Sequence, residues 1–475
     1  MQRPNIIFVM LDTVRADVLD IYGGKTKTRT MSKIAKKAAV YENAIAPGTY
    51  TVPSHVSLFT GKRVKEIPSL TKDPMKYSDQ NTDPFLVKSK YVNESEMTLA
   101  KRMRYLGYDT AMFSNNPFVS KATGIANGFG YVENLWLEDM VENNRPFVKN
   151  VLRIIERDRV RKSLIRIAYE ISRLMPSETL NSIYMKLRTT LNVKFAKEYG
   201  FYRLDKGAAK TNAAISRYLS NSGKNPVFMF VNYMEAHEGY PTSLITKRYV
   251  EQDKWLHLSG LKGKDDLPVI KEAYSKRIEY LDTQVGRLIG ILREKGILDN
   301  AVLVLASDHG QAFMEHDIMY HNMFPYNEVS RVPLISAKFE DGKQVDIRER
   351  VSNFVGLSAL YDSILGIGIG RQDEVNGNLR RDNFVFSDHV GITEVWDLQL
   401  LKLIKGRSRY ANAIYNTKKY HNTFATAVYY KNFKLVHFFN GNIKDKMYNL
   451  SEDPEEKEDI IDNNRSLAHM MARTA

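Results

Sequence analysis

The sequence predicts an α/β protein built around a mostly parallel β-sheet. Residues 5–11 (Asn-Ile-Ile-Phe-Val-Met-Leu), 226–233 (Pro-Val-Phe-Met-Phe-Val-Asn-Tyr) and 301–306 (Ala-Val-Leu-Val-Leu-Ala) are short apolar runs. Such runs are typical of strands that are buried on both faces, as in a parallel sheet covered by helices. Segments with helical character lie between them, which fits this fold class.

The other elements follow in order along the chain. Helices are expected over five segments: 31–40, 98–106, 205–219, 265–295 and 353–364. A further strand is expected at 108–114. Residues 65–95 are polar and contain three Pro, so we expect a long loop there that covers the ligand side of the sheet.

The last quarter of the chain has a different pattern. Short strands are expected at 383–387, Ala425–Tyr430 and 433–439, and they favour a small antiparallel sheet. The 475 residues suffice for one large domain and a smaller one. We therefore expect a main α/β domain over residues 1–375 and a C-terminal α+β subdomain over residues 376–475.

Composition excludes some classes of site. The chain has no Cys, which excludes disulfides, thiolate metal ligands and a cysteine nucleophile. Met1 leads almost directly into the first strand, and we find no apolar run of about 18 residues that could span a bilayer. A cytoplasmic protein is expected.

The formal net charge of +14 is unevenly distributed. Residues 145–206 hold 15 Lys or Arg and 6 Asp or Glu, within a predicted helical insertion over about 140–205. Its amphipathic pattern fits packing on the main domain, and it also fits contact with an anionic surface. No nucleic-acid partner is expected, because no aromatic residues alternate with the charges in a base-stacking pattern.

Acidic and imidazole side chains follow two of the predicted strands. Asp12 ends the first run, and Asp308 and His309 follow the run at 301–306. In open α/β sheets, ligands bind outside the carboxyl ends of the strands. This set suits Mg²⁺, Ca²⁺ or Mn²⁺, and the single His leaves Zn²⁺ open. The alternative is a strand-end turn held by a salt bridge.

A hydroxyl group precedes another predicted helix. Thr51 stands two residues before Pro53, and Pro is favoured in the first turn of a helix. The hydroxyl of Ser54 and the backbone N–H groups of that turn can face an anion, which the helix dipole favours. Thr51 is thus a candidate nucleophile at an anion-binding helix end, and an ordinary capped helix is the alternative.

Five motifs, in this order along the chain, resemble the sulfatase branch of the alkaline phosphatase superfamily. They are residues 5–17, 51–61, 307–310, 331–335 and 447–454. The resemblance implies a large mixed, mostly parallel sheet flanked by helices, with a small C-terminal antiparallel sheet. It also implies a metal-dependent hydrolase that acts on a small anionic ester.

The resemblance assigns the metal ligands residue by residue. It implies that Asp12, Asp308 and His309 bind the metal and that Thr51 touches it as the nucleophile. Many sulfatases carry an acidic or amide residue directly after the first Asp, where this chain has Thr13. We therefore expect one divalent metal ion rather than two.

Thr51 is also a departure from the family pattern. Sulfatases convert a Cys or Ser at this position into formylglycine, and Thr cannot become that aldehyde because its Cβ carries a methyl group. Thr is the nucleophile in phosphodiesterase, phosphonate-hydrolase and phosphoethanolamine-transferase relatives. A phosphate or phosphonate ester is therefore the expected substrate. Sulfate-ester hydrolysis, phosphotransfer to another alcohol, and an inactive member that binds an anionic surface are the alternatives.

The histidines supply the remaining expected roles. His55 replaces the family's Arg after Pro-Ser and could donate to a reacting oxygen. His237 and His321 resemble the basic residues that contact the anion or the leaving group, so both are expected to be catalytic. His316, Asn115 and Asn116 are expected at the substrate. Five other histidines are expected to have surface or structural roles: His257, His389, His421, His437 and His469.

Overall fold

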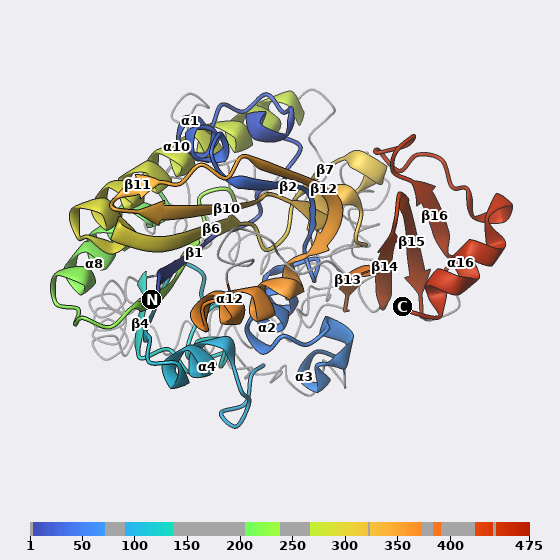
Figure 1. Ribbon diagram of the computed structural model, residues 1–475. Helices are drawn as coiled ribbons and strands as arrows, with labels where there is room; N and C mark the ends of the chain where they lie inside the picture. The colour runs from blue at the N-terminus through green and yellow to red at the C-terminus, as the bar shows by residue number, and fades with distance from the viewer. Residues whose placement is uncertain are drawn as a thin grey trace, which may run out of the picture.

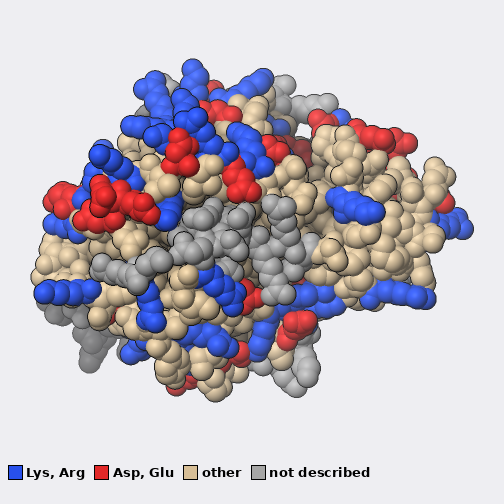
Figure 2. Space-filling model, in the orientation of Figure 1, with Lys and Arg blue, Asp and Glu red and all other residues tan. Residues whose placement is uncertain are grey.

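The computed structural model describes residues 3–71, 91–135, 205–237, 267–321, 324–371, 383–390, 423–439 and 443–475. The basic segment up to residue 204, most of the expected loop at 65–95, and His257 and His421 lie outside the described residues. On the face shown in Figure 2, basic side chains gather over the end where α1 and α10 lie, with acidic ones among them. The predicted contact of residues 145–206 with an anionic surface depends on the basic segment, and nearly all of that segment lies outside the described residues. This contact therefore stays a prediction.

A large mixed sheet forms the centre of the main domain (Figure 1). Its strand order is β12 (Glu349–Gly356), β2 (Ala39–Ile45), β10 (Leu334–Glu340), β6 (Asn300–Ala306), β1 (Asn5–Leu11), β5 (Val227–Tyr233), β3 (Asp109–Ser114) and β4 (Tyr131–Asn134). β1 lies between β5 and β6 and is parallel to both, whereas β10 is antiparallel to β6 and β2. The short strands β9 (Arg331–Val332) and β11 (Lys343–Gln344) pair with β2 and β10. The expected mixed, mostly parallel sheet is confirmed.

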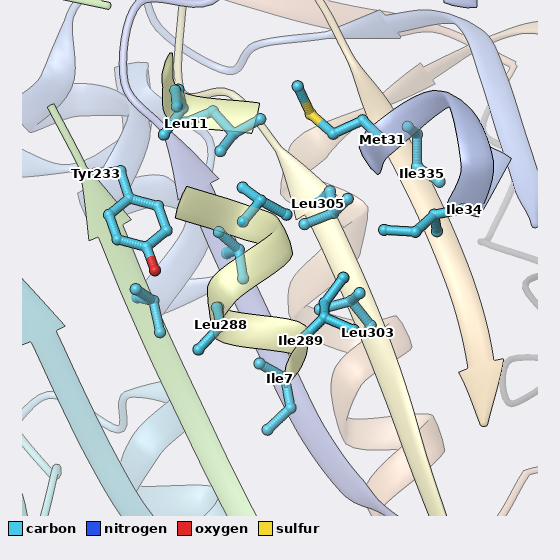
Figure 3. Packing of buried hydrophobic residues seen from close by; sticks show 14 of the residues in the cluster. Ile7, Leu11, Met31, Ile34, Tyr233, Leu288, Ile289, Leu303, Leu305 and Ile335 are labelled. Carbon is cyan, nitrogen blue, oxygen red and sulfur yellow. The ribbon is translucent and has the colours of Figure 1, made fainter. Parts of the chain in front are cut away.

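Helices cover both faces of this sheet because its central strands are apolar on both sides. α1 (Arg29–Ala35), α8 (Ala208–Ser220) and α10 (Leu267–Glu294) pack on the face that carries Ile7, Val9 and Leu11. Figure 3 shows Leu288 and Ile289 of α10 packed against the strand residues Ile7, Leu303 and Leu305. α2 (Thr51–Thr60), α4 (Leu99–Tyr105) and α12 (Leu360–Gly368) pack on the face that carries Ile6, Phe8 and Met10. Burial of each such side chain stabilises the fold by about 1.5–3 kcal/mol.

The C-terminal part forms the expected antiparallel sheet, drawn on the right of Figure 1. It consists of β13 (Val385–His389), β14 (Ala425–Tyr430), β15 (Phe433–Phe438) and β16 (Lys446–Asn449), in that order. α16 (Arg465–Ala472) packs on it through Ala468 and Met471. The hairpin β7 (Ala312–Phe313) and β8 (Met319–Tyr320) stands apart from both sheets.

Short helical turns complete the described elements. They are η1 (Asp20–Tyr22), η2 (Val64–Glu66), α3 (Pro68–Thr71), η5 (Ile297–Asp299), η6 (Glu315–Asp317), α11 (Asn327–Ser330), η7 (Leu357–Ala359) and η8 (Ile461–Asn463). The start of the expected loop at 65–95 is therefore helical. Over the described ranges, we find no helix with the length and apolar character needed to cross a bilayer.

Two helix predictions were wrong at one end. The helix expected over 31–40 ends at Ala35, and Ala39 begins strand β2. The helix expected over 353–364 begins only at Leu360, because residues 353–356 belong to β12 and the next three form the turn η7. β2 and β12 pair with each other in parallel across about 300 residues of sequence. Pairing over such a separation overrides local helical preference.

Candidate active site

The two aspartates predicted at strand ends lie next to each other. Asp12 follows β1 and Asp308 follows β6, and these strands are adjacent and parallel, with Met10 opposite Ala306. Both carboxylates are fully buried, as is His309. The parallel pairing thus brings Asp12 and Asp308 from the two ends of the main domain to one edge of the sheet.

His309 faces both carboxylates through one ring nitrogen. Its Nε2 lies 3.5 Å from Asp308 Oδ2 and 4.0 Å from Asp12 Oδ1. Its Nδ1 lies 2.9 Å from Gly310 O, and a carbonyl oxygen only accepts, so Nδ1 carries the proton. The lone pair on Nε2 therefore points toward the two aspartates, as a neutral imidazole ligand of a metal would.

The carboxylates have the electrostatics of an ion site. Asp12 Oδ1 and Asp308 Oδ2 are buried and have no hydrogen-bond partner within the described part of the chain. Burial, and next the Asp308 carboxylate, raise the pKa of Asp12 to about 7, and burial raises the pKa of Asp308 to about 7. Buried carboxylates without a counter-charge are costly unless a cation neutralises them. With His309, their ligand atoms lie within 4.8 Å of one another, so these residues fit a divalent cation.

The Thr51 hydroxyl lies at the same cluster. Thr51 is the first residue of α2, and its Oγ1 is 3.4 Å from His309 Nε2. Asn116 Nδ2 donates to Asp12 Oδ2 over 2.9 Å and lies 3.5 Å from Thr51 Oγ1. Asn116 was expected at the substrate, and the structure puts its amide between the nucleophile candidate and a metal-ligand candidate.

Three imidazole rings lie in a row that begins within this cluster, in the order His309, His321 and His237. The centroids of the His309 and His321 rings are 4.5 Å apart, and those of His321 and His237 are 5.1 Å apart. His321 Nδ1 lies 2.8 Å from Gln311 Oε1, which orients the ring. Sequence reasoning missed Gln311, although it directly follows the Asp-His-Gly motif.

His55 lies beneath the nucleophile turn. Its Nδ1 donates to Thr51 O over 2.8 Å and is 3.6 Å from Asp308 Oδ2. The ring packs edge-on against Phe230, and burial lowers the pKa of His55 to about 4, so the ring is neutral near pH 7. The Nδ1 proton of His55 is thus hydrogen-bonded to the backbone carbonyl oxygen of Thr51, the candidate nucleophile.

Three residues expected at the substrate engage other partners. Ser54 Oγ donates to Gly48 O over 3.1 Å, inside the turn that precedes α2. Asn115 Oδ1 accepts from the Thr211 hydroxyl over 3.0 Å. The ring of His316 stacks on Tyr326 at 3.9 Å between centroids, and its Nε2 faces Glu328 Oε1 at 3.7 Å.

Thr13 does not offer its hydroxyl to the cluster. Its backbone is left-handed, with φ of 62°, and its Oγ1 donates to Asp12 O over 2.7 Å. Its backbone N–H donates instead to Asp308 Oδ1 over 3.2 Å. Two residues further along, Arg15 Nη2 pairs with Asp17 Oδ2 at 2.6 Å. Thr13 therefore orients one metal-ligand candidate through its backbone.

Comparison with known proteins identifies the family. The family model named Sulfatase matches residues 4–369, which is most of the chain. The chain belongs to the sulfatase family. Members of this family bind a divalent metal, and the buried cluster of Asp12, Asp308 and His309 matches that requirement.

Individual sulfatase relatives align along most of the chain. The N-acetylglucosamine-6-O-sulfatase of Bacteroides thetaiotaomicron is 23% identical over 97% of this chain and 83% of its own length. An arylsulfatase of Clostridium perfringens is 21% identical over 82% of both chains. Among solved structures, the phosphonate monoester hydrolase of Agrobacterium radiobacter superposes with a TM-score of 0.62 at 16% identity, over 99% of this chain and 94% of that chain. This last likeness concerns the fold.

Proposed function

We propose that this member of the sulfatase family is a metal-dependent hydrolase of an anionic ester and that Thr51 is its nucleophile. The observation that carries the proposal is the position of the Thr51 hydroxyl, 3.4 Å from His309 Nε2 at the buried carboxylate cluster. Asp12, Asp308 and His309 would hold the ion. A bound divalent cation acts as a Lewis acid that makes a hydroxyl a better nucleophile and stabilises developing negative charge.

A phosphorus ester is the preferred substrate because of the chemistry of threonine. The methyl group on Cβ prevents Thr51 from becoming formylglycine, so the hydroxyl itself must attack. In the proposed reaction the Thr51 hydroxyl loses its proton and Oγ1 bonds to phosphorus. The bond from phosphorus to the leaving ester oxygen breaks, and this oxygen takes up a proton and departs as an alcohol. Water then attacks the phosphorus of this threonine ester, which releases phosphate or phosphonate according to the substrate and restores the Thr51 hydroxyl.

The surrounding side chains supply orientation and proton transfer. Asn116 Nδ2 lies 3.5 Å from Thr51 Oγ1 and holds Asp12, so it fixes the nucleophile relative to the ion site. His321 and His237 extend the site beyond His309, where an imidazole can hold a non-bridging oxygen or protonate the leaving oxygen. Gln311 Oε1 lies 2.8 Å from His321 Nδ1 and orients this ring.

Sulfate-ester hydrolysis is the second candidate. The N-acetylglucosamine-6-O-sulfatase and the arylsulfatase align along most of the chain, and both names specify sulfate esters. With Thr51 the same attack would form a sulfothreonine ester, which water must hydrolyse without the aldehyde chemistry of formylglycine. This second step is the reason we rank sulfate below phosphorus.

A matched substrate panel distinguishes the two candidates. Turnover would be measured for the aryl phosphate, phosphodiester, phosphonate and sulfate of one phenol, with Mg²⁺, Ca²⁺, Mn²⁺ or Zn²⁺ added to chelator-treated protein. We expect a phosphorus ester to be the best substrate and activity to vanish in the chelator. Faster turnover of the sulfate than of every phosphorus ester would reverse our ranking.

A further inference from the structure

Strand β13 of the small sheet is hydrogen-bonded to the turn that carries the nucleophile candidate. The Asp388 N–H donates to Pro47 O over 2.9 Å, and Gly48 forms an isolated parallel bridge with Asp388. One residue further along each segment, Thr49 Oγ1 and His389 Nδ1 share a hydrogen bond of 3.0 Å. Thr49 is fully buried and His389 nearly so. Two segments about 340 residues apart thus meet in register.

The same strand also holds the chain beyond the other end of α2. Asp388 Oδ2 accepts from the Lys65 N–H over 3.2 Å, and its Oδ1 lies 3.6 Å from Arg63 Nη2. The Arg63 guanidinium lies 3.5 Å above the centre of the Phe386 ring. Thr426 Oγ1 donates to Asp388 Oδ1 over 2.6 Å and fixes the carboxylate from strand β14. β13 therefore contacts the chain both before and after α2.

The turn between β2 and α2 is tightly packed around Gly48. A Cβ atom on Gly48 would lie 2.9 Å from Pro53 and 3.0 Å from the backbone N of Ser54, which is closer than real Cβ atoms normally approach. Ser54 Oγ also donates to Gly48 O over 3.1 Å. We therefore expect a shift of residues 47–49 to displace the first turn of α2, where Thr51 lies.

We propose that His389 is a positioning residue for the nucleophile, acting on Thr51 through Thr49, and that β13 is the strand that holds α2 in place. This inference rests on the proposed role of Thr51. Displacement of a reacting group by about 1 Å can cost roughly 10²-fold in rate. Because His389 acts through Thr49, its loss affects the chemical step more than substrate binding.

The test uses four single variants and one double variant of the full chain. His389→Leu and Thr49→Val each remove the shared hydrogen bond, whereas His389→Asn keeps a polar group at the position of Nδ1. The control is His437→Leu on β15, which removes a histidine from the same sheet, where its Nδ1 is 2.7 Å from Asp445 Oδ2. The double variant carries His389→Leu and Thr49→Val together. The readouts are kcat, KM, and amide hydrogen exchange over residues 47–54.

We expect His389→Leu and Thr49→Val to lower kcat by about 10- to 100-fold with KM within about twofold of wild type. The double variant should be no slower than the worse single variant, because both remove one interaction. His389→Asn should recover most of kcat, and His437→Leu should leave kcat unchanged. Exchange over residues 47–54 should accelerate in His389→Leu and not in His437→Leu.

Several results would overturn the inference. These are a kcat within twofold of wild type in His389→Leu, losses in the two single variants that multiply in the double variant, or unchanged exchange over residues 47–54. If His389→Leu does not fold, His389→Gln replaces it, because Gln places its polar group near Nε2 and should lose kcat equally. If Thr51→Ala kept full turnover, the proposed function would fail, while the exchange measurement would still decide whether β13 holds the turn.

Discussion

Asn116 donates a hydrogen bond from Nδ2 to Asp12 Oδ2 over 2.9 Å, and both side chains are buried. Asn116 also lies within 3.5 Å of the Thr51 hydroxyl, so one amide links the candidate nucleophile to a candidate metal ligand. The backbone keeps it there, because Phe118 N–H donates to Asn116 Oδ1 over 2.9 Å. The amide is thus held at both of its polar atoms.

The first prediction concerns Asn116. Asn116→Ala should lower metal affinity and turnover by about 10- to 100-fold each, as loss of residues that orient metal ligands commonly does. Calorimetric titration with Mn²⁺ and steady-state kinetics would measure the two effects. The neighbouring Asn115→Ala is the comparison, because Asn115 binds Thr211 and should affect metal affinity much less. Equal losses in both variants would contradict the role given to Asn116.

The second prediction concerns the metal ligands. Asp12→Ala and Asp308→Ala should each abolish activity and metal binding, because each removes one of the two buried carboxylates at the site. Metal analysis of the purified, dialysed variants would measure the bound ion. Stoichiometric metal in the double variant would refute the assigned ligand set.

The third prediction concerns pH and the metal-free protein. The pKa of Asp12 and of Asp308 is raised to about 7 in the folded state, well above the value near 4 of an unfolded chain. The folded state therefore holds more protons than the unfolded state between about pH 4 and pH 7, so the stability of the metal-free protein falls as pH rises through this window. Melting temperatures measured in a chelator across these pH values should show the decline.

Two comparisons make that experiment specific. Asp12→Asn should flatten the decline, because the amide does not titrate. Saturating metal should also flatten it, since a bound cation favours the ionised carboxylates. A metal-free wild-type protein whose stability rose between pH 5 and pH 7 would contradict the raised pKa values.

The fourth prediction concerns Thr51. Thr51→Ala should lose several orders of magnitude in turnover and still bind the metal through the remaining ligands. Thr51→Ser should keep substantial activity, because it loses only a methyl group. Mass spectrometry of acid-quenched wild-type protein should detect phosphate on the peptide that carries Thr51. Near-wild-type turnover in Thr51→Ala would instead favour direct attack by water.

The fifth prediction separates two histidines that lie five residues apart. His321 faces the rings of His309 and His237, whereas His316 stacks on Tyr326 beside Glu328. His321→Leu should lower kcat/KM by at least about 10²-fold, as expected for a group that aids proton transfer or holds the anion. His316→Leu should leave kcat/KM within a few-fold of wild type. The opposite ranking would return His316 to the substrate site.

The sequence by itself determined the frame of the site. Runs of aliphatic residues can be buried on both faces only in the middle of a covered sheet, and β1, β5 and β6 lie there. Because parallel neighbours end at one edge, the positions of Asp12, Asp308 and His309 followed from the ends of those runs. The helix predicted after Thr51 is present as well, because a helix start depends on a few adjacent residues, although α2 already begins at Thr51.

Only the tertiary structure decided which other polar side chains reach the cluster of Asp12, Asp308 and His309. Asn115 and Asn116 are adjacent, yet one binds α8 and the other binds Asp12, because their side chains leave the turn in different directions. His316 has a left-handed backbone with φ of 52°, which no periodicity reveals, and it faces Glu328 instead of the cluster. His389 was expected to be structural or on the surface, and it meets Thr49 only because β13 aligns with a turn some 340 residues earlier. Side-chain direction and long-range register arise from packing the whole chain, and short motifs do not contain them.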